Sequence, residues 1–440
     1  MIVILGGGPA GRLASIRLAS AGKQVILVEH GGIGGQCLHS GCMPVCALND
    51  VAHLIHSARE LYDLGVIDTI PVPDFPVLLK KMGEIQKKIT SILDEETRSA
   101  GVEIIYGRTG RLDGRTAYAN DESLKAEAVI AATGSRPHIP AIPGIDLPGV
   151  FTSRTLSTMK NLPESMTIIG GSVAAAEFAY IFSTFGCEVT ILSRSTFLKD
   201  ADKHIQALAI KELDGVTIRE NTPVTSISGR DRVESLRTPE GELEADAIFL
   251  ATGLIPNSET LIGVKKGPLG EIVVDTRMRT SIPDVYACGD VAGPPYLTPV
   301  ARHQGIVAAD NILGIPRTMD YKHIPRSISL AHELAYCIND RKGMGSLAVP
   351  GPAGPGSFWS VPTGKTGLAK VIFDPESGEL AGICAAGPGG GLIAGYMAFL
   401  MKKHFSVHDF EEFIEVHPST DGVYGLAKYA SSILKKRKTN

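Results

Sequence analysis

A glycine-rich turn between two apolar runs, near the start of this 440-residue chain, constrains the fold more than any other sequence feature. The run Ile2–Leu5 passes through Gly6-Gly-Gly8-Pro-Ala-Gly11 into a helical pattern, and the next apolar run, Val25–Val28, ends at Glu29. The glycines permit a tight turn, a close backbone approach to a pyrophosphate, and close packing of helix on strand. Glu29 can accept hydrogen bonds from a ribose. The sequence therefore predicts a βαβ unit that binds a dinucleotide at the start of its helix.

The same unit occurs a second time in the middle of the chain. Met166–Ile169 leads into Gly170-Gly-Ser172-Val-Ala, a helical pattern follows, and the apolar run Val189–Leu192 ends at Ser193-Arg194. Both copies close with a related strand and turn: Ala128–Gly134 and Ala247–Gly253. A chain with two such units is expected to bind two dinucleotides, or one dinucleotide and one flavin.

The two copies differ at the residue that contacts the ribose. Glu29 would repel a 2′-phosphate, whereas Arg194, which follows Ser193, can neutralise one. The second unit is therefore expected to bind NADPH in preference to NADH. The other residues expected to bind the nucleotide there lie in the turn and the closing strand: Gly170, Ser172, Val173 and Gly253. The alternative is that Arg194 is only a solvated surface residue.

Composition favours an α/β protein and argues against several other classes. Aromatic residues make up only 6% of the chain, while runs rich in Val and Ile, typical of parallel strands, are frequent. The net charge of −4 gives no indication of a nucleic acid or an anionic membrane as partner. We find no export signal and no apolar run long enough to span a bilayer. Together with an odd seven cysteines, this predicts a cytoplasmic protein with reduced thiols and one catalytic pair.

Four further motifs point to a known family. They are Cys37-x-x-x-x-Cys42 after the first βαβ unit, the Ala-Thr-Gly turns at 132–134 and 251–253, Tyr286-Ala-Cys-Gly-Asp290, and a late His417-Pro418. In this order they resemble the flavin-dependent pyridine nucleotide-disulfide oxidoreductases over essentially the whole chain. Single segments are similar to particular members: Leu297–Ala301 to glutathione reductase, Gly171–Val173 to mercuric reductase, and the C-terminal region to dihydrolipoamide dehydrogenase.

The resemblance implies two Rossmann-like domains and a C-terminal α+β dimerisation domain. The implied boundaries are 1–140 for the first part of the FAD domain, 141–260 for the NAD(P) domain, 261–318 for the return to the FAD domain, and 319–440 for dimerisation. FAD then binds to the first unit and NADPH, or NADH, to the second. The residues implied for FAD are Gly6, Gly8, Pro9, Ala10, Gly11, Glu29, Gly35, Gln36, Thr133, Gly134, Asp290, Leu297, Thr298 and Ala301. The resemblance also implies a homodimer in which His417 reaches the cysteines of the other subunit.

By the same resemblance, Cys37 is the outer thiol that exchanges with substrate and Cys42 is the inner thiol beside the flavin. Residues five apart on a regular helix have Cα atoms about 8 to 9 Å apart, whereas a disulfide needs about 4.4 to 6.8 Å. We therefore expect a bend between the two cysteines, which Gly35 and Gly41 permit. Two alternatives stay open. One is a set of buried thiols that act as small hydrophobes, and the other is a zinc site formed by Cys37, His39, Cys42 and Cys46.

Thiol exchange needs a proton donor and acceptor near the outer thiol, and His417 has the family position for that role. Two departures from the family pattern affect the site. Cys46 stands where the family has a lysine that pairs with a glutamate of a neighbouring helix. That glutamate is Glu177, which is also expected at the catalytic site. Without the lysine, burial should raise the pKa of Glu177. Gly422 replaces the glutamate that orients the histidine, and the neighbouring Asp421 is expected to point about 100° away.

The sequence predicts an FAD-dependent NAD(P)H:disulfide oxidoreductase in which electrons pass through the Cys37–Cys42 disulfide to a small disulfide substrate. Dihydrolipoamide dehydrogenase is the alternative within the family, and Arg194 and Gly422 weigh against it. Two alternatives differ in kind. One is a flavin quinone reductase or oxidase with secondary cysteines. The other is a non-enzymatic redox sensor in which Cys46, one turn after Cys42, takes part in exchange.

Overall fold

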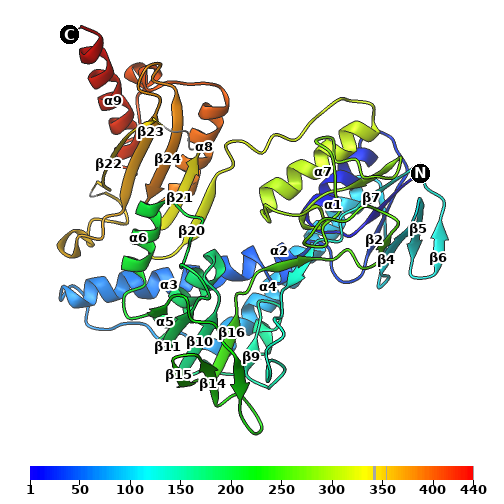
Figure 1. Cartoon of the computed structure of the whole chain (residues 1–440), viewed down its shortest axis with the longest axis horizontal. Coiled ribbons are helices and arrows are strands. Elements are labelled where there is room, and N and C mark those ends of the chain that lie inside the picture. The colour runs from blue at the N-terminus through cyan, green and yellow to red at the C-terminus, as the bar shows by residue number, and fades with distance from the viewer. Residues whose placement is uncertain (340–342, 353, 440) are drawn as a thin grey trace.

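The computed structural model describes residues 1–339, 343–352 and 354–439, and it contains three regions that are each built on a five-stranded sheet (Figure 1). Two of these sheets are parallel and the third is antiparallel. None of the helices in these ranges is long and apolar enough to cross a membrane. The predicted α/β fold class is confirmed.

The first sheet has the strand order β19-β7-β1-β2-β3 and is parallel throughout. β1 forms its centre because all four of its side chains are apolar and both faces of the sheet are covered. Helices α1 and α7 lie side by side against this sheet (Figure 1). They approach closely because a Cβ at Gly305 would lie only 2.3 Å from the carbonyl oxygen of Ala10. The elements are β1 (Ile2–Leu5), α1 (Pro9–Ala19), β2 (Val25–Glu29), β3 (Val102–Tyr106), β7 (Ala128–Ala131), β19 (Val285–Ala287) and α7 (Thr298–Ile312).

The second sheet, β12-β11-β10-β16-β9, repeats this plan and confirms the predicted second βαβ unit. Its elements are β9 (Val150–Phe151), β10 (Ser165–Ile169), α5 (Val173–Thr184), β11 (Glu188–Leu192), α6 (Lys203–Glu212), β12 (Thr217–Arg219) and β16 (Ala247–Leu250). Smaller sheets flank the two units. They are formed by β4 (Gly110–Asp113), β5 (Thr116–Ala119), β6 (Glu122–Leu124) and β18 (Leu261–Ile262), by β8 (Ser135–Pro137) and β17 (Leu254–Pro256), and by β13 (Ser226–Ser228), β14 (Ser235–Thr238) and β15 (Gly241–Glu244).

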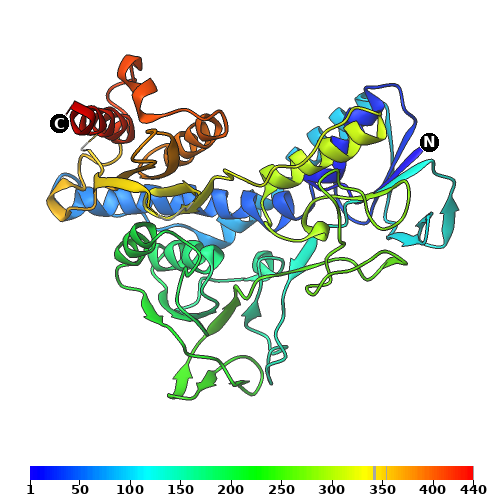
Figure 2. The ribbon, with the colours of Figure 1, turned by 45° about the horizontal axis from the view of Figure 1, so that its top comes forward.

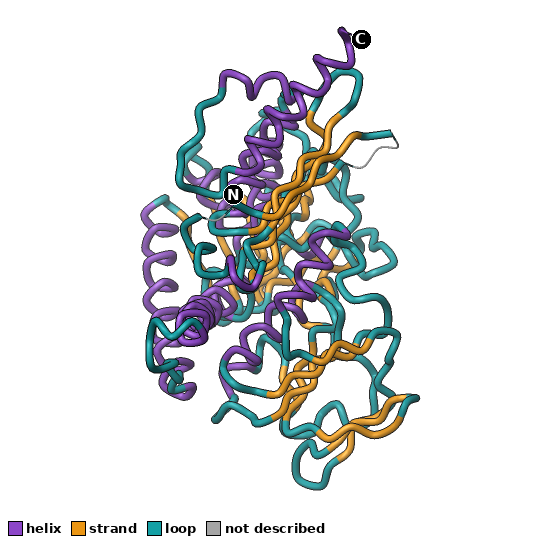
Figure 3. Tube along the Cα trace, turned by 90° about the vertical axis from the view of Figure 1, so that its left-hand side faces the viewer, coloured by secondary structure: helices purple, strands orange, loops and turns teal. Residues whose placement is uncertain are grey.

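The third sheet is antiparallel, in the order β20-β21-β24-β23-β22. Helices α8 and α9 pack on one of its faces, as the side view in Figure 3 shows, and α6 of the second region contacts it through β21. Three apolar side chains of α8, Leu392, Tyr396 and Phe399, remain exposed on the single chain. The elements are β20 (Arg326–Ser329), β21 (Glu333–Ile338), β22 (Gly345–Pro350), β23 (Leu368–Phe373), β24 (Leu380–Ala386), α8 (Gly390–Lys402) and α9 (Gly422–Thr439).

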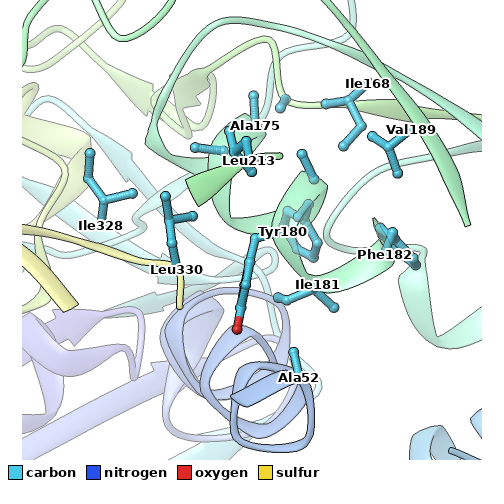
Figure 4. Packing of buried hydrophobic residues seen from close by; sticks show 14 of the residues in the cluster. Ala52, Ile168, Ala175, Tyr180, Ile181, Phe182, Val189, Leu213, Ile328 and Leu330 are labelled. Atoms are coloured by element: carbon cyan, nitrogen blue, oxygen red, sulfur yellow. The ribbon is translucent and has the colours of Figure 1, made fainter. Parts of the chain in front are cut away.

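Three helices between the first and second βαβ units connect the regions: α2 (Gly35–His39), α3 (Cys42–Asp63) and α4 (Phe75–Ser99). In Figure 2, α3 runs between the second region below it and the C-terminal region above it. One core joins these parts, because buried side chains of α3, α5 and the end of β20 pack together, among them Ala52, Tyr180, Ile328 and Leu330 (Figure 4). Short 3-10 turns lie at Leu156–Thr158, Asp290–Ala292, Val361–Thr363 and Val407–Glu412.

Candidate active site

The backbone breaks between the two cysteines of the Cys37-x-x-x-x-Cys42 motif. Cys37 lies on α2 and Cys42 is the first residue of α3, and the break falls on Ser40 and Gly41. A Cβ at Gly41 would lie 3.0 Å from the carbonyl oxygen of Gln36, so this fold-back leaves little room for a side chain. The predicted bend is confirmed. It brings the thiols of Cys37 and Cys42 into hydrogen-bond contact, although all seven cysteines of the chain are unpaired in the structure.

The two thiols differ strongly in acidity. The hydrogen bond from Cys42 lowers the pKa of Cys37 to about 6 against the effect of burial, and Thr298 and the charge of Arg302 act in the same direction. The same hydrogen bond, together with burial, raises the pKa of Cys42. The Sγ atom of Cys42 lies 3.5 Å from the hydroxyl of Thr298, the first residue of α7. The outer sulfur is therefore the one that carries negative charge near neutral pH.

Cys46 and Glu177 lie beside the inner thiol. Burial raises the pKa of Glu177 to about 7, and the charge of Cys42 adds to this effect. Partial burial of its thiol raises the pKa of Cys46, and the charges of Cys42, Asp50 and Glu177 act in the same direction. Within the described structure the carboxylate of Glu177 accepts one hydrogen bond, at 3.0 Å from the backbone N–H of Ser329. The raised pKa predicted for a glutamate without its lysine partner is thus confirmed.

His417 has a carboxylate partner, contrary to our expectation. Its Nδ1 atom lies 2.6 Å from Oδ2 of Asp421. The prediction that Asp421 points away was wrong because Asp421 directly precedes α9, so the rotation per residue of a helix does not apply to it. The imidazole itself is exposed, with 75% of its side-chain surface accessible in the single chain. A histidine held by a carboxylate through Nδ1 keeps Nε2 available for proton transfer.

The glycine turn of the first βαβ unit forms a cradle without side chains. Gly6 has a φ of +108°, and a Cβ at Gly11 would lie 2.0 Å from its carbonyl oxygen. From the opposite side, Gly35 packs against Gly8, since a Cβ at Gly35 would lie 2.7 Å from the Cα of Gly8. Helix α1 begins with Pro9 and Ala10 and has no side-chain cap in the described structure, so its first N–H groups can bind a pyrophosphate.

Polar atoms around this cradle fit a bound flavin dinucleotide. Both carboxylate oxygens of Glu29 accept backbone N–H groups, from Gly7 at 2.6 Å and from Gly31 at 2.8 Å, which fixes them at the edge of the cradle. The buried Oε1 of Gln36 has no hydrogen-bond partner in the part of the chain that the structure describes. Such an acceptor requires a donor, which the hydroxyl groups of FAD can supply.

Asp290 lies at the end of the cradle, where it begins the 3-10 turn that follows β19. It accepts a hydrogen bond from the Ser135 hydroxyl at 2.6 Å, and burial raises its pKa. Thr133 donates to the carbonyl of Asn257 at 2.6 Å, and Gly134 has a φ of +70°. Three predicted residues lie at the start of α7: Leu297 as its N-cap, Thr298 as its first residue, and the buried Ala301. The structure thus brings the predicted FAD residues to one edge of the first sheet.

The second βαβ unit offers a similar cradle. A Cβ at Gly170 would lie 2.2 Å from the carbonyl oxygen of Ala251, and a Cβ at Gly171 would lie 2.2 Å from Oγ of Ser193. Ser172 precedes α5, which begins at Val173 without a side-chain cap in the described residues. Arg194 is exposed beside the buried Ser193, and Gly253 has a φ of +103°. The unit can hold a nucleotide pyrophosphate, with an arginine at the ribose end.

Several residues at these sites were not predicted in their roles. Arg302 could have been found from its position one turn after Thr298 on the predicted helix, whereas no helical spacing indicates Asp421, because residues 417–421 are not helical. Ser135 follows the predicted Ala-Thr-Gly turn directly. In the described ranges, no group of three or more histidine, cysteine or acidic side chains is arranged to hold a metal ion.

Comparison with known proteins places these features in context. Residues 1–305 match the family described as pyridine nucleotide-disulphide oxidoreductase, and residues 355–427 match its dimerisation domain. Dihydrolipoyl dehydrogenase of Bacillus subtilis is 29% identical over 95% of both chains. Mercuric reductase of Shigella flexneri is 30% identical over 99% of this chain and 81% of its own. The solved structure of the HOCl-induced flavoprotein disulfide reductase RclA from Escherichia coli has a TM-score of 0.85 and 25% identity, covering 97% of this chain and 99% of that chain.

Proposed function

Because the chain belongs to the pyridine nucleotide-disulphide oxidoreductases, enzymes that use FAD and NAD(P)H, we propose that it reduces a small disulfide with electrons from NADPH. The observation that carries this proposal is the asymmetric thiol pair. Cys37 and Cys42 meet across a helix break, and the outer sulfur has a pKa of about 6. An acidic outer thiol supports this role because the thiolate is the form that attacks a disulfide.

The cofactors bind to the two cradles, which assigns residues 1–140 and 261–318 to an FAD domain and 141–260 to an NAD(P) domain. Bound FAD would accept a hydride from the nicotinamide and supply two electrons to the Cys37–Cys42 disulfide. Gly6, Gly8 and Gly11 leave room for the FAD pyrophosphate, and Asp290 accepts from its ribityl chain. Arg194 binds the 2′-phosphate of NADPH, supported by its exposure next to Ser193.

The exchange steps use side chains of the protein and the substrate disulfide. The Cys37 thiolate attacks one sulfur of the substrate and forms a mixed disulfide, while the other substrate sulfur leaves as a thiolate and takes a proton. Once Cys37 is held in the mixed disulfide it no longer carries the charge that raises the pKa of Cys42. Cys42 then loses its proton and attacks the Cys37 sulfur, and the second substrate sulfur leaves as a thiolate and takes up a proton, which re-forms the Cys37–Cys42 disulfide. One disulfide is reduced to two thiols, and the pair at the site is oxidised.

His417 of the partner subunit supplies the proton in this proposal. The dimerisation domain of the family implies a homodimer. Within the single chain, the imidazole is exposed and held by Asp421 at 2.6 Å, which suits a group that projects toward another subunit. An odd number of cysteines, seven, is also compatible with a reducing, cytoplasmic location.

Anaerobic titration with NADPH tests the proposal. We expect NADPH to bleach the flavin and to raise a long-wavelength thiolate-to-flavin absorption band, and we expect Cys42→Ser to lose this band. Flavin reduction without the band in the unaltered protein would refute the dithiol role. Turnover is then compared for lipoamide, glutathione disulfide, coenzyme A disulfide, quinone and mercuric ion. Cupric ion is included because RclA has been solved as a Cu(II) complex.

Two controls separate the alternative functions. Full turnover with quinone or oxygen by a Cys37→Ser/Cys42→Ser protein would favour a quinone reductase or oxidase. A disulfide that includes Cys46 in the oxidised protein, found by mass spectrometry of its peptides, would favour a redox sensor. Neither result is expected if Cys37 and Cys42 carry the electrons.

A further inference from the structure

The turn between β20 and β21 is held by three helices of other regions. This turn, residues 329–332, lies in the C-terminal region but carries the N–H group that Glu177 of α5 accepts. The carbonyl of Leu330 accepts a hydrogen bond from His53 of α3. At the other end, Glu212 of α6 accepts the backbone N–H of His332 at 3.1 Å. The hydrogen bonds of one short turn therefore join the redox helix α3 to both helices of the nucleotide unit.

His332, at the end of the turn, forms a buried ion pair with Glu212 of α6. Nδ1 of His332 lies 2.8 Å from Oε1 of Glu212, and the two side chains are 6% and 1% exposed. Burial opposes protonation of His332, but the hydrogen bond and charge of Glu212 outweigh it and raise the pKa of the imidazole. Glu212 thus receives two hydrogen bonds from one residue, which fixes that end of the turn in place.

The other end of the turn reaches the redox centre. Ser329, the last residue of β20, donates to the carboxylate of Glu177, which faces Cys42 and Cys46 on α3. This is the one hydrogen bond of that carboxylate in the described structure. The stability of the ionised form of Glu177 therefore depends on where the Ser329 N–H group lies. Only two residues lie between Ser329 and His332. Ile328 and Leu330 are fully buried, so the turn is packed on both sides of Ser329.

We propose that Glu212 and His332 are a positioning pair for the redox centre: through residues 329–332 they hold the Ser329 N–H group against Glu177, and so control the charge beside Cys42 and Cys46. Neither residue touches the reacting sulfurs. The inference rests on the proposed function, because it assigns a role at the same thiol site. The inference adds the buried pair Glu212 and His332 to the groups that act on that site.

Other charged groups face this pair and enter its titration. Glu60 of α3 acts on His332 together with Glu212. His332 and Lys365, which lies before β23, act on His56 of α3, and Arg59 of α3 acts on Tyr180; Glu60 and Glu212 act on both. The charge of Cys42 acts on Glu177. The charges of Cys42, Asp50 and Glu177, all from α3 and α5, act on Cys46. Ser360 donates to Glu60 at 2.7 Å, which holds that carboxylate in the cluster.

The test measures the alkylation rate of Cys46 in the reduced protein, because this exposed thiol responds to the charge of Glu177. Asp50 also acts on Cys46 but is unchanged in every variant. Iodoacetamide labelling between pH 6 and 9, quantified by mass spectrometry of the Cys46 peptide, needs neither substrate nor turnover. The variants are Glu212→Gln, which keeps the acceptor geometry, and His332→Asn, which can keep a donor near Nδ1. Loss of the charge pair should loosen the turn, weaken the Ser329 hydrogen bond and leave Glu177 more protonated. We expect Cys46 to react about two to three times faster near pH 7 in both variants.

The matched control breaks the ion pair at the other end of α6. Lys370 is 8% exposed and binds the Asp202 N-cap of that helix at 2.6 Å, away from the turn. Lys370→Gln should leave the Cys46 rate unchanged. Glu177→Gln should raise the rate by itself, and His332→Asn should add nothing in that background, because the pair acts through Glu177.

Two results would overturn the proposal. In one, Glu212→Gln and His332→Asn change the rate no more than Lys370→Gln does. In the other, His332→Asn keeps its effect when Glu177 is already glutamine. Far-UV circular dichroism identifies a variant that fails to fold, in which case the other member of the pair decides the outcome. A protein without NADPH-dependent disulfide turnover would refute the proposed function and would leave this labelling result to be judged separately.

Discussion

Glu177→Gln should make the protein more stable at neutral pH. A pKa of about 7 against the ordinary 4.5 means that the folded protein holds a proton that the unfolded chain has released between these pH values. The free energy of unfolding therefore falls as the pH rises from 4.5 to 7, and the full cost is present above pH 7. That cost is about 3 kcal/mol. Glutamine cannot ionise, but its side-chain oxygen can still accept the Ser329 N–H group.

The assay is chemical unfolding in urea at pH 5 and at pH 8. We expect the free energy of unfolding of Glu177→Gln, relative to the unaltered protein, to be greater at pH 8 than at pH 5 by about 2 to 3 kcal/mol. Glu103→Gln, at an exposed position of β3, serves as the control and should show no such difference. An equal difference between variant and unaltered protein at both pH values would refute the reasoning, since Glu177 would then not pay a burial cost.

Three further predictions concern the reacting groups. Asp421→Asn should lower kcat/KM for the disulfide about 10- to 100-fold, because it removes the charge that orients His417. The rate at which NADPH reduces the flavin, measured by stopped flow, should stay unchanged, and a slower flavin step would contradict this prediction. The alkylation rate of Cys37 should rise with a midpoint near pH 6, and in Cys42→Ala the midpoint should move toward the ordinary 9, because the hydrogen bond from Cys42 is the main cause of its acidity. Arg194→Ala should raise KM for NADPH about 10-fold or more and leave KM for NADH unchanged, and an equal change for both nucleotides would count against a phosphate contact.

Much of the fold could be predicted because its signals are local. The strand Ile2–Leu5 and the turn after it are found where the apolar run and the glycines indicate. The break before Cys42 followed from the reach of a disulfide compared with the rise of a helix. The raised pKa of Glu177 followed from one missing partner, Cys46 in place of a lysine.

The contacts that sequence reasoning missed join distant parts of the chain. Ser329 meets Glu177 across 152 positions, and His332 meets Glu212 across 120, and no local pattern indicates either contact. Asp421 was misjudged for a different reason, since a helical rotation was applied to a residue that precedes its helix. Local periodicity specifies elements, while the pairing of side chains between elements depends on tertiary packing.

The exposed side chains Leu392, Tyr396 and Phe399 of α8 have a consequence for how folding depends on protein concentration. They follow one another at intervals of four and three residues and so form a single apolar stripe along the helix. In a homodimer that covers this stripe, association and folding share the same apolar burial, so the midpoint of thermal unfolding rises with protein concentration. Dilution would then return the stripe to water and, if His417 of the partner subunit serves each thiol pair as proposed, would remove that histidine from the site. The fall in the unfolding midpoint and the loss of activity should therefore begin at the same dilution.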